Sequence, residues 1–101
     1  MLYNCIYNTG YGDIRWSPLK SQRLKRTRGV SFEEMITAEL IDVKVHPGRE
    51  GQALLLFKLR DYIWVVPFVE DEKGIFLKTL YPSRRYTKIY RNIRRSGHEE
   101  D

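Results

Sequence analysis

The stretch YIWVVPFVEDEKGIFLKTLYPSRRY (residues 62–86) decides the fold of this chain. It contains two apolar runs, Tyr62–Val69 and Gly74–Tyr81, which are joined by a polar turn. Apolar runs of this length, rich in β-branched and aromatic residues, predict two paired β-strands. The second run leads directly into Ser83, a favourable N-cap residue, so a helix is expected to begin there.

The helix expected after Ser83 combines an apolar stripe with a basic surface. Apolar side chains recur at helical spacing at Tyr86, Ile89, Tyr90 and Ile93. The basic residues fall outside this stripe, at Arg84, Arg85, Lys88, Arg91, Arg94 and Arg95. A helix start presents N–H donors and the positive end of the helix dipole, and guanidinium groups match the oxygens of phosphate. The sequence therefore predicts a surface for a polyanion at this helix.

Two more helices are predicted nearer the N-terminus. Ser17 suits the N-cap and Pro18 the first position of a basic helix, which Gly29 can end in a left-handed conformation. The expected apolar anchors of this helix are Trp16, Leu19 and Leu24. Ser31 and Glu34 form a capping box, which predicts a second, short helix that ends near Leu40.

Two strands, Ile41–His46 and Ala53–Leu59, complete the expected elements. The order predicts an α+β fold with two N-terminal helices, a four-stranded antiparallel sheet and a C-terminal helix. We expect one domain over residues 1–95, with residues 1–13 as an uncertain extension or strand and residues 96–101 as a disordered tail.

Charge is concentrated in two segments of this 101-residue chain, whose formal net charge is +5. Residues 15–28 and residues 83–95 each contain six basic residues and no acidic residue. If the two segments lie side by side, they form one positive face; the alternative is that their charge only solvates two helices. No apolar run approaches the roughly 20 residues of a membrane span. A single cysteine fits a reducing compartment, and a cytoplasmic location is expected.

Three motifs resemble those of the BrnT-type toxins of type II toxin–antitoxin modules, which are relatives of the RelE/ParE superfamily. The first is an aromatic–polar–Pro–x–Lys step at Trp16–Lys20 followed by Gly29–Glu34. The second is an apolar strand that ends at Val65–Glu70, and the third is the junction Tyr81–Thr87, which leads into a helix with a tyrosine. The resemblance covers residues 16–95. The extension at residues 1–13 and the loop at residues 47–52 depart from the family pattern.

This resemblance implies a RelE-like fold and a ribonuclease that stops translation. It also implies a small cognate antitoxin as partner, an RNA substrate and two toxin copies within the complex. By resemblance, Arg84, Arg85 and Tyr90 correspond to positions linked with toxicity, and Ser83 to a small or hydroxyl position.

RNA cleavage needs a base for the 2′-hydroxyl, charge to stabilise the phosphorane and an acid for the leaving oxygen. Arg84 and Arg85 can supply the charge, and His46 and Tyr90 are the candidates for proton transfer. His46 could instead be an exposed histidine at a strand end, and Tyr90 could instead be a residue of the helix's apolar stripe. The two roles of Tyr90 are compatible, because a tyrosine can bury its ring and present its hydroxyl. Further RNA-binding candidates are Lys20, Arg23, Lys58, Ser83, Lys88 and Arg91. One cysteine and two distant histidines do not suit a zinc site, so neither a metal nor another cofactor is expected.

Two other functions remain open from the sequence. The weak inventory of acids and bases favours a non-catalytic module whose basic face holds nucleic acid or an acidic partner. A toxin relative that acts on another target, such as a topoisomerase, would have the same basic surface.

Overall fold

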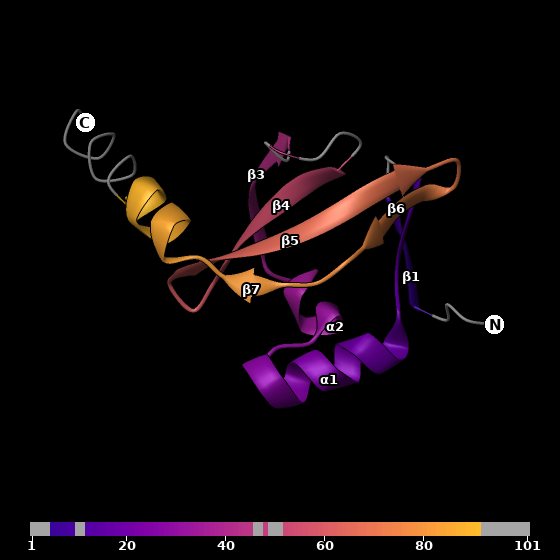
Figure 1. The fold of residues 1–101 in the computed structure, drawn as a ribbon, viewed down its shortest axis with the longest axis horizontal. Helices are drawn as coiled ribbons and strands as arrows, with labels where there is room; N and C mark the ends of the chain where they lie inside the picture. Colours follow the sequence, from indigo (N-terminus) through magenta and orange to yellow (C-terminus); the bar gives the residue numbers. More distant parts are fainter. Residues whose placement is uncertain (1–4, 10–11, 46–47, 49–51, 92–101) are drawn as a thin grey trace.

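A computed structural model describes residues 5–9, 12–45, 48 and 52–91 of the chain (Figure 1). Its elements are β1 (Cys5–Thr9), β2 (Gly12–Trp16), α1 (Pro18–Arg28), α2 (Phe32–Met35), β3 (Glu39–Val45), β4 (Gln52–Leu59), β5 (Tyr62–Asp71), β6 (Gly74–Leu77) and β7 (Tyr81–Pro82). Residues 84–91 are helical as well, and are called the C-terminal helix below. The α+β class is confirmed.

The prediction of a four-stranded antiparallel sheet is wrong in strand number and in direction. The strands lie in the order β1-β2-β6-β5-β4-β3, and β7 pairs with β5. β1 and β2 form an antiparallel hairpin, so part of the segment 1–13 belongs to the sheet. β2 then pairs with β6 in parallel, at Asp13–Gly74, Ile14–Ile75 and Arg15–Phe76, which makes the sheet mixed.

Gly74 explains why β2 can approach β6 so closely. Its φ of +145° is one that other residues rarely adopt, and an added Cβ would lie 2.1 Å from the Asp13 carbonyl oxygen. Arg15 strengthens the same junction, because its guanidinium donates to both carboxylate oxygens of Asp71 at 2.6 Å. Asp71 in turn accepts the Lys73 and Gly74 N–H groups, and Arg15 holds the pKa of its carboxyl below the ordinary value. The β5–β6 hairpin is thereby fixed to β2.

The helix starts agree with the sequence. Ser17 accepts the N–H of Lys20 at the start of α1, and Gly29 ends this helix at φ +82°. The capping box of Ser31 and Glu34 is present at the start of α2.

Two details of these helices were predicted wrongly. Leu19 is not an anchor of α1, since its side chain is 73% exposed. The buried residues of α1 are Ser21 and Leu24, and Leu19 lies two positions from Ser21, which turns it to the outer side. α2 ends at Met35 rather than near Leu40, because the chain turns after Ile36 and Leu40 joins β3.

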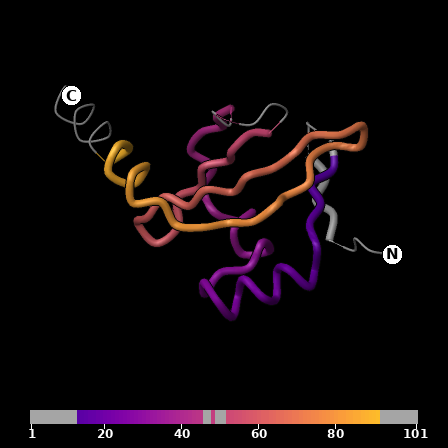
Figure 2. Tube along the Cα trace, viewed as in Figure 1, coloured from indigo at the N-terminus to yellow at the C-terminus, as the bar shows by residue number. Residues whose placement is uncertain are grey.

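The last strand is also shorter than expected. β6 ends at Leu77, and the chain returns to β5 only at Tyr81–Pro82 (Figure 2). Pro67 lies opposite this gap and its carbonyl accepts the Lys78 N–H at 2.8 Å. A proline has no N–H to donate, so Pro67 suits a position beside this gap.

The sheet buries an apolar cluster on each face. Because alternate residues of a strand point to opposite faces, Leu55 and Phe57 of β4 point to one face and Leu54 and Leu56 to the other. The larger cluster, here the helix-pair core, contains Trp16, Leu24, Val30, Phe32, Met35, Leu55, Phe57, Trp64, Val66, Phe68, Ile75, Leu77 and Leu80. α1 and α2 cover it. The smaller cluster contains Leu54, Leu56, Ile63 and Val65, against which Ile41, Tyr86 and Tyr90 pack.

The C-terminal helix therefore lies on the face opposite to α1 and α2, at one end of the sheet (Figure 1). In the described part of the chain, none of the helices has the length and apolar character that crossing a membrane requires.

Candidate functional site

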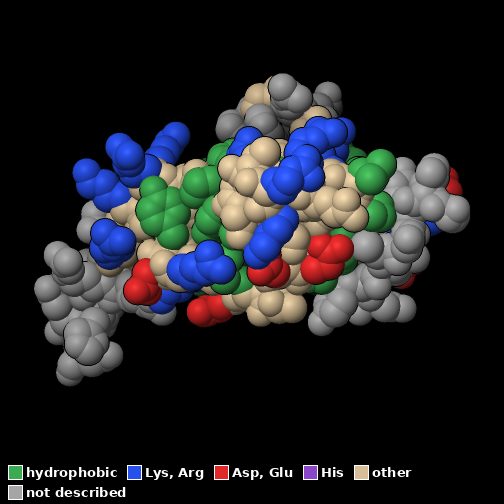
Figure 3. Space-filling view, turned by 90° about the horizontal axis from the view of Figure 1, so that it is seen from below, with side chains coloured by type: hydrophobic (Ala, Val, Ile, Leu, Met, Phe, Trp, Pro, Cys, Tyr) green, Lys and Arg blue, Asp and Glu red, His purple; other side chains and the backbone are tan. Residues whose placement is uncertain are grey.

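The C-terminal helix presents basic side chains on an exposed surface. Arg84, Arg85, Lys88 and Arg91 are all exposed, and residues 78–91 contain no acidic residue. Figure 3 shows Lys and Arg side chains gathered at the end of the molecule where this helix lies. These four residues are called the basic cluster. Like-charged groups on a single helix repel one another, so an anion that binds among them relieves this repulsion.

Ser83 holds the start of this helix as an N-cap. Its hydroxyl accepts the N–H of Tyr86 at 3.1 Å, as the sequence predicted. The hydroxyl is thus engaged in capping, and Ser83 positions Arg84 and Arg85 at the first helical turn.

Thr87 attaches the helix to the sheet. Its side chain is buried, its hydroxyl donates to the Ser83 carbonyl at 2.6 Å, and it accepts the N–H of Ile63 in β5 at 2.8 Å. Tyr86 and Tyr90 pack on the smaller apolar cluster at either side of this contact. The direction in which the basic cluster points is set by these few contacts.

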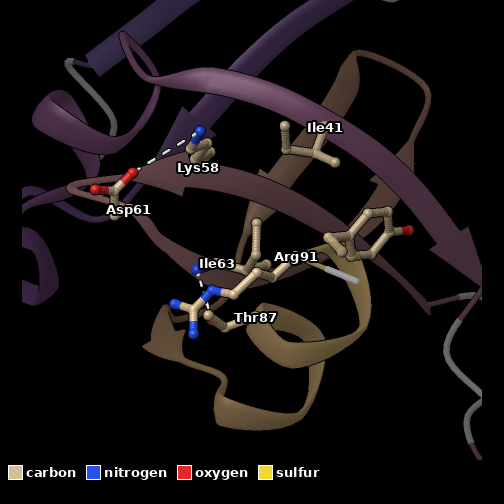
Figure 4. Close-up of a pocket in the computed structure, with 7 residues that line it drawn as sticks. Ile41, Lys58, Asp61, Ile63, Thr87 and Arg91 are labelled. Atoms are coloured by element: carbon tan, nitrogen blue, oxygen red, sulfur yellow. Dashed lines mark hydrogen bonds and ion pairs between the residues drawn. The ribbon is translucent and has the colours of Figure 1, made fainter. Parts of the chain in front are cut away.

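A pocket of about 450 Å³ lies between the helix and the sheet (Figure 4). Its lining residues are Ile41, Lys58, Asp61, Ile63, Thr87, Tyr90 and Arg91. Figure 4 shows Lys58 and Asp61 on one side and Arg91 with Thr87 on the other. The Lys58 ammonium lies 3.9 Å from the Asp61 carboxylate, and its side chain is only 25% exposed. The pocket thus combines an apolar floor with two cations and a carboxylate.

Arg84 and Arg85 do not line this pocket. The guanidinium carbon of Arg85 lies 6.0 Å from the centre of the Tyr86 ring, in cation–π range. The two arginines lie at the start of the helix and Arg91 lies two turns further on. An extended polyanion, rather than one isolated phosphate, is the ligand that could contact all of them.

Tyr90 is bound to residues of β3. Its hydroxyl donates to Asp42 Oδ2 at 2.6 Å, and the Lys44 ammonium lies 3.6 Å from the same oxygen. Burial, followed by the hydrogen bond to Asp42, raises the pKa of Tyr90 above its ordinary value. The predicted role of Tyr90, proton transfer at the cationic surface, would require a lowered pKa. The nearby carboxylate has the opposite effect, because it disfavours a second negative charge.

The two partners of Tyr90 are shifted as well. The hydrogen bond from Tyr90, followed by that from the Val43 N–H, lowers the pKa of the Asp42 carboxyl. The negative charge that Tyr90 carries when ionised, followed by that of Asp42, raises the pKa of Lys44. Asp42 is therefore ionised and Lys44 protonated at neutral pH. Tyr90, Asp42 and Lys44 together fasten the C-terminal helix to β3. Tyr90 is therefore suited to hold the helix in position rather than to act as a base.

The structure brings together only part of the predicted site. Lys58 does lie beside Arg91 and Tyr90 in the pocket. Lys20 and Arg23 lie on α1, over the opposite face of the sheet, so they do not contribute to the pocket. Arg28, at the end of α1, donates to the Leu80 carbonyl at 2.9 Å, so the end of the first basic segment lies near the chain that leads into the C-terminal helix. His46 lies outside the described residues.

Sequence reasoning missed Asp42, Asp61 and Thr87. A signal existed for Asp61, because it lies between two apolar runs and three residues after Lys58. In the structure, Arg60 and Asp61 form the tight turn there and both have positive φ (+56° and +64°). The other two act through partners 48 and 24 residues away, and no local pattern marks them.

Comparisons with protein-family models, with curated proteins and with solved structures each gave no match.

Proposed function

We propose that the protein is the toxin of a type II toxin–antitoxin pair and acts in the cytoplasm as a metal-independent endoribonuclease. The observation that carries this proposal is the exposed basic cluster, held in a fixed direction beside a pocket with further cations. The resemblance of residues 16–95 to BrnT-type toxins supplies the class of reaction. A cognate antitoxin, complementary in charge, would silence the protein by covering the basic cluster.

RNA fits the basic cluster because the cluster is an array of cations rather than a cavity for one ion. Arg84 and Arg85 at the helix start and Arg91 at the pocket would contact successive phosphates of one strand. Each such contact releases counterions, so affinity is expected to fall steeply with salt. The apolar floor of the pocket, made by Ile41 and Ile63, would accept an unpaired base.

The proposed reaction is attack of a ribose 2′-oxygen on the adjacent phosphorus. The bond to the 5′-oxygen breaks, a 2′,3′-cyclic phosphate forms, and the 5′-oxygen leaves after it takes a proton from solvent water. Lys58 and Arg91 would stabilise the charge of the phosphorane, and the Asp61 carboxylate at the mouth of the pocket would accept the 2′-proton. Tyr90 would hold the C-terminal helix, and with it Arg91, in place through its hydrogen bond to Asp42.

A second candidate is an RNA-binding module without catalysis. The engagement of the Tyr90 hydroxyl by Asp42 favours this candidate, because it removes the most obvious proton donor of the site.

Cleavage and binding can be separated in one experiment. The protein is expressed from an inducible promoter without an antitoxin, growth is followed and total RNA is mapped for new 5′ ends. Arg84→Ala, Arg85→Ala and Arg91→Ala are compared with Lys73→Ala, which removes an exposed cation from the β5–β6 turn. For a nuclease, Arg91→Ala removes a cation that stabilises the phosphorane, so cleavage should fall about 100-fold while RNA affinity falls much less. Arg84→Ala and Arg85→Ala should mainly weaken RNA binding, because these residues contact neighbouring phosphates.

The remaining outcomes assign the alternatives. Purified protein that binds RNA without forming ends, with a parallel loss of affinity in the arginine variants, would replace the nuclease by the binding module. Growth arrest with intact RNA and a DNA-damage response would indicate a target such as a topoisomerase.

A further inference from the structure

The strand β3 has no neighbour on its outer side in the part of the chain that the structure describes. It nevertheless exposes large apolar side chains, Leu40 at 51%, Val43 at 52% and Val45 at 79%. Their partners in β4 are Phe57, Leu55 and Ala53, which belong to the helix-pair core or pack against it. An apolar row along a free strand edge is a template for pairing with another strand.

The opposite face of β3 has charges of both signs. Asp42 and Lys44 lie across from Leu56 and Leu54, so they project to the face of the C-terminal helix. Their side chains are 42% and 40% exposed. The negative and the positive residue flank Val43 symmetrically, one on each side.

We propose that two copies of the chain associate by pairing their β3 strands antiparallel, with a two-fold axis at Val43. In this register Val43 meets Val43 of the second copy, and Asp42 of each copy lies opposite Lys44 of the other. Val45 of each copy then lies across from Ile41 of the other copy. Ile41 is the residue at which the β3–β4 register shifts, between Leu40 and Asp42. The arrangement continues one sheet through both copies.

The charge pattern argues for a second copy rather than for an unrelated strand. A two-fold interface presents the same surface from both sides, so it requires self-complementary charges. Among antiparallel registers near the middle of β3, centring on Val43 produces two Asp42–Lys44 pairs, whereas centring on Asp42 sets two carboxylates against each other. Opposite charges directly across a sheet stabilise pairing and like charges oppose it.

Pairing would exchange contacts that each copy now makes within itself. Lys44 lies 3.6 Å from Asp42 of its own chain, and Asp42 Oδ1 accepts the N–H of Val43 at 2.8 Å. Because the two intrachain contacts are replaced by the Asp42–Lys44 pairs and by strand pairing, the net gain comes from covering Val43 and Val45. The buried area is that of a few side chains, so a reversible, concentration-dependent dimer is expected.

Sedimentation velocity of the full chain over a range of concentrations tests the proposal. Wild type is expected to shift from monomer to dimer as concentration rises. Val43→Lys places two ammonium groups at the axis and should remain monomeric, and Lys44→Asp should do the same by opposing carboxylates. Leu19→Lys is the matched control, since it adds the same charge at a 73% exposed leucine on α1.

The double exchange Asp42→Lys with Lys44→Asp restores opposite charges across the axis and should recover the dimer that Lys44→Asp loses. Circular dichroism and thermal unfolding confirm that each variant is folded. A wild type that stays monomeric throughout, a dimer that persists in Val43→Lys, or a double exchange that remains monomeric would each overturn the pairing. A monomeric wild type would leave the β3 edge to a different chain.

Discussion

The two faces of the sheet are held by different kinds of interaction. On one face, α1 and α2 with their flanking residues bury Val30, Phe32 and Met35 completely. On the other, the C-terminal helix contributes one buried residue, Thr87, and two half-buried tyrosines. The first attachment depends on apolar volume and the second on a small number of hydrogen bonds.

This difference separates stability from the proposed function. The basic cluster lies on the lightly attached helix, so a variant that detaches this helix should leave the main core intact. Segments attached by few buried contacts open at lower free energy than the global unfolding reaction. Variants on the helix-pair face should therefore lower the global stability of the fold. Variants at the C-terminal helix should have a smaller effect, mainly on local opening of that helix and on RNA affinity.

The largest effect is expected on the helix-pair core. Phe32→Ala removes a ring that is 0% exposed and lies 6.2 Å from the Trp16 ring, measured between centroids. The loss of unfolding free energy should be about 3–5 kcal/mol, as for other buried aromatic truncations. Urea denaturation measures it, and Phe32→Leu, which retains most of the volume, should lose much less. Equal losses for the two variants would show that the core is not tightly packed around this ring.

A smaller and more local effect is expected for Thr87→Val. Valine has the same shape but cannot accept the Ile63 N–H, which would remain buried without a partner. The cost should be about 1–3 kcal/mol, and amide hydrogen exchange should quicken over residues 84–91 more than in β4.

Thr87→Ser is the control, because it keeps the hydroxyl and loses only a methyl group. RNA affinity should fall in the valine variant and be largely retained in the serine variant. If Thr87→Val were as stable as Thr87→Ser, the hydrogen bond to β5 would not be what attaches the helix.

The elements that the sequence predicted well are those with local signals. Ser17, Ser31 and Ser83 each cap a helix within three residues of the N–H they accept, so the chain itself carries the information. The four predicted strands correspond to β3, β4, β5 and β6. For β4 and β5 the apolar run reflects burial in the sheet, whereas β3 is mostly exposed and was recognised by its alternating pattern. The ends of these strands were less accurate, as at Leu77, where tertiary pairing rather than composition stops β6.

What could not be predicted depends on partners distant in the sequence. The parallel pairing of β2 with β6 joins Asp13 and Gly74, which are 61 positions apart. Neither segment contains a sequence signal that identifies the other as its partner. The candidate site shows the same limit. The basic residues were evident from the sequence. The raised pKa of Tyr90 was not, because it depends on burial and on Asp42, and the contact with Asp42 depends on where β3 lies relative to the C-terminal helix.

The smallest expected effect returns to the helix-pair face, at an exposed ion pair rather than in the core. Glu34 accepts the Lys25 ammonium at 2.9 Å and the Ser31 N–H at 2.9 Å. These contacts, led by the hydrogen bond from Lys25, lower the pKa of Glu34 from 4.5 to about 2. Since the folded state favours the ionised form, the stabilisation is present above pH 4.5 and disappears as the pH falls from 4.5 towards 2.

Glu34→Gln tests this assignment without removing the capping box, because glutamine also serves at the third helical position. Across that acidic window, its unfolding free energy should fall less steeply than that of wild type, as measured by thermal denaturation at several pH values. Glu72→Gln, at an exposed position in the β5–β6 turn, should follow wild type. If the curves of wild type and Glu34→Gln ran parallel through the window, the charge of Glu34 would add nothing to the capping geometry. The helix-pair face would then depend on apolar burial and neutral caps alone, which would make its contrast with the C-terminal helix sharper still.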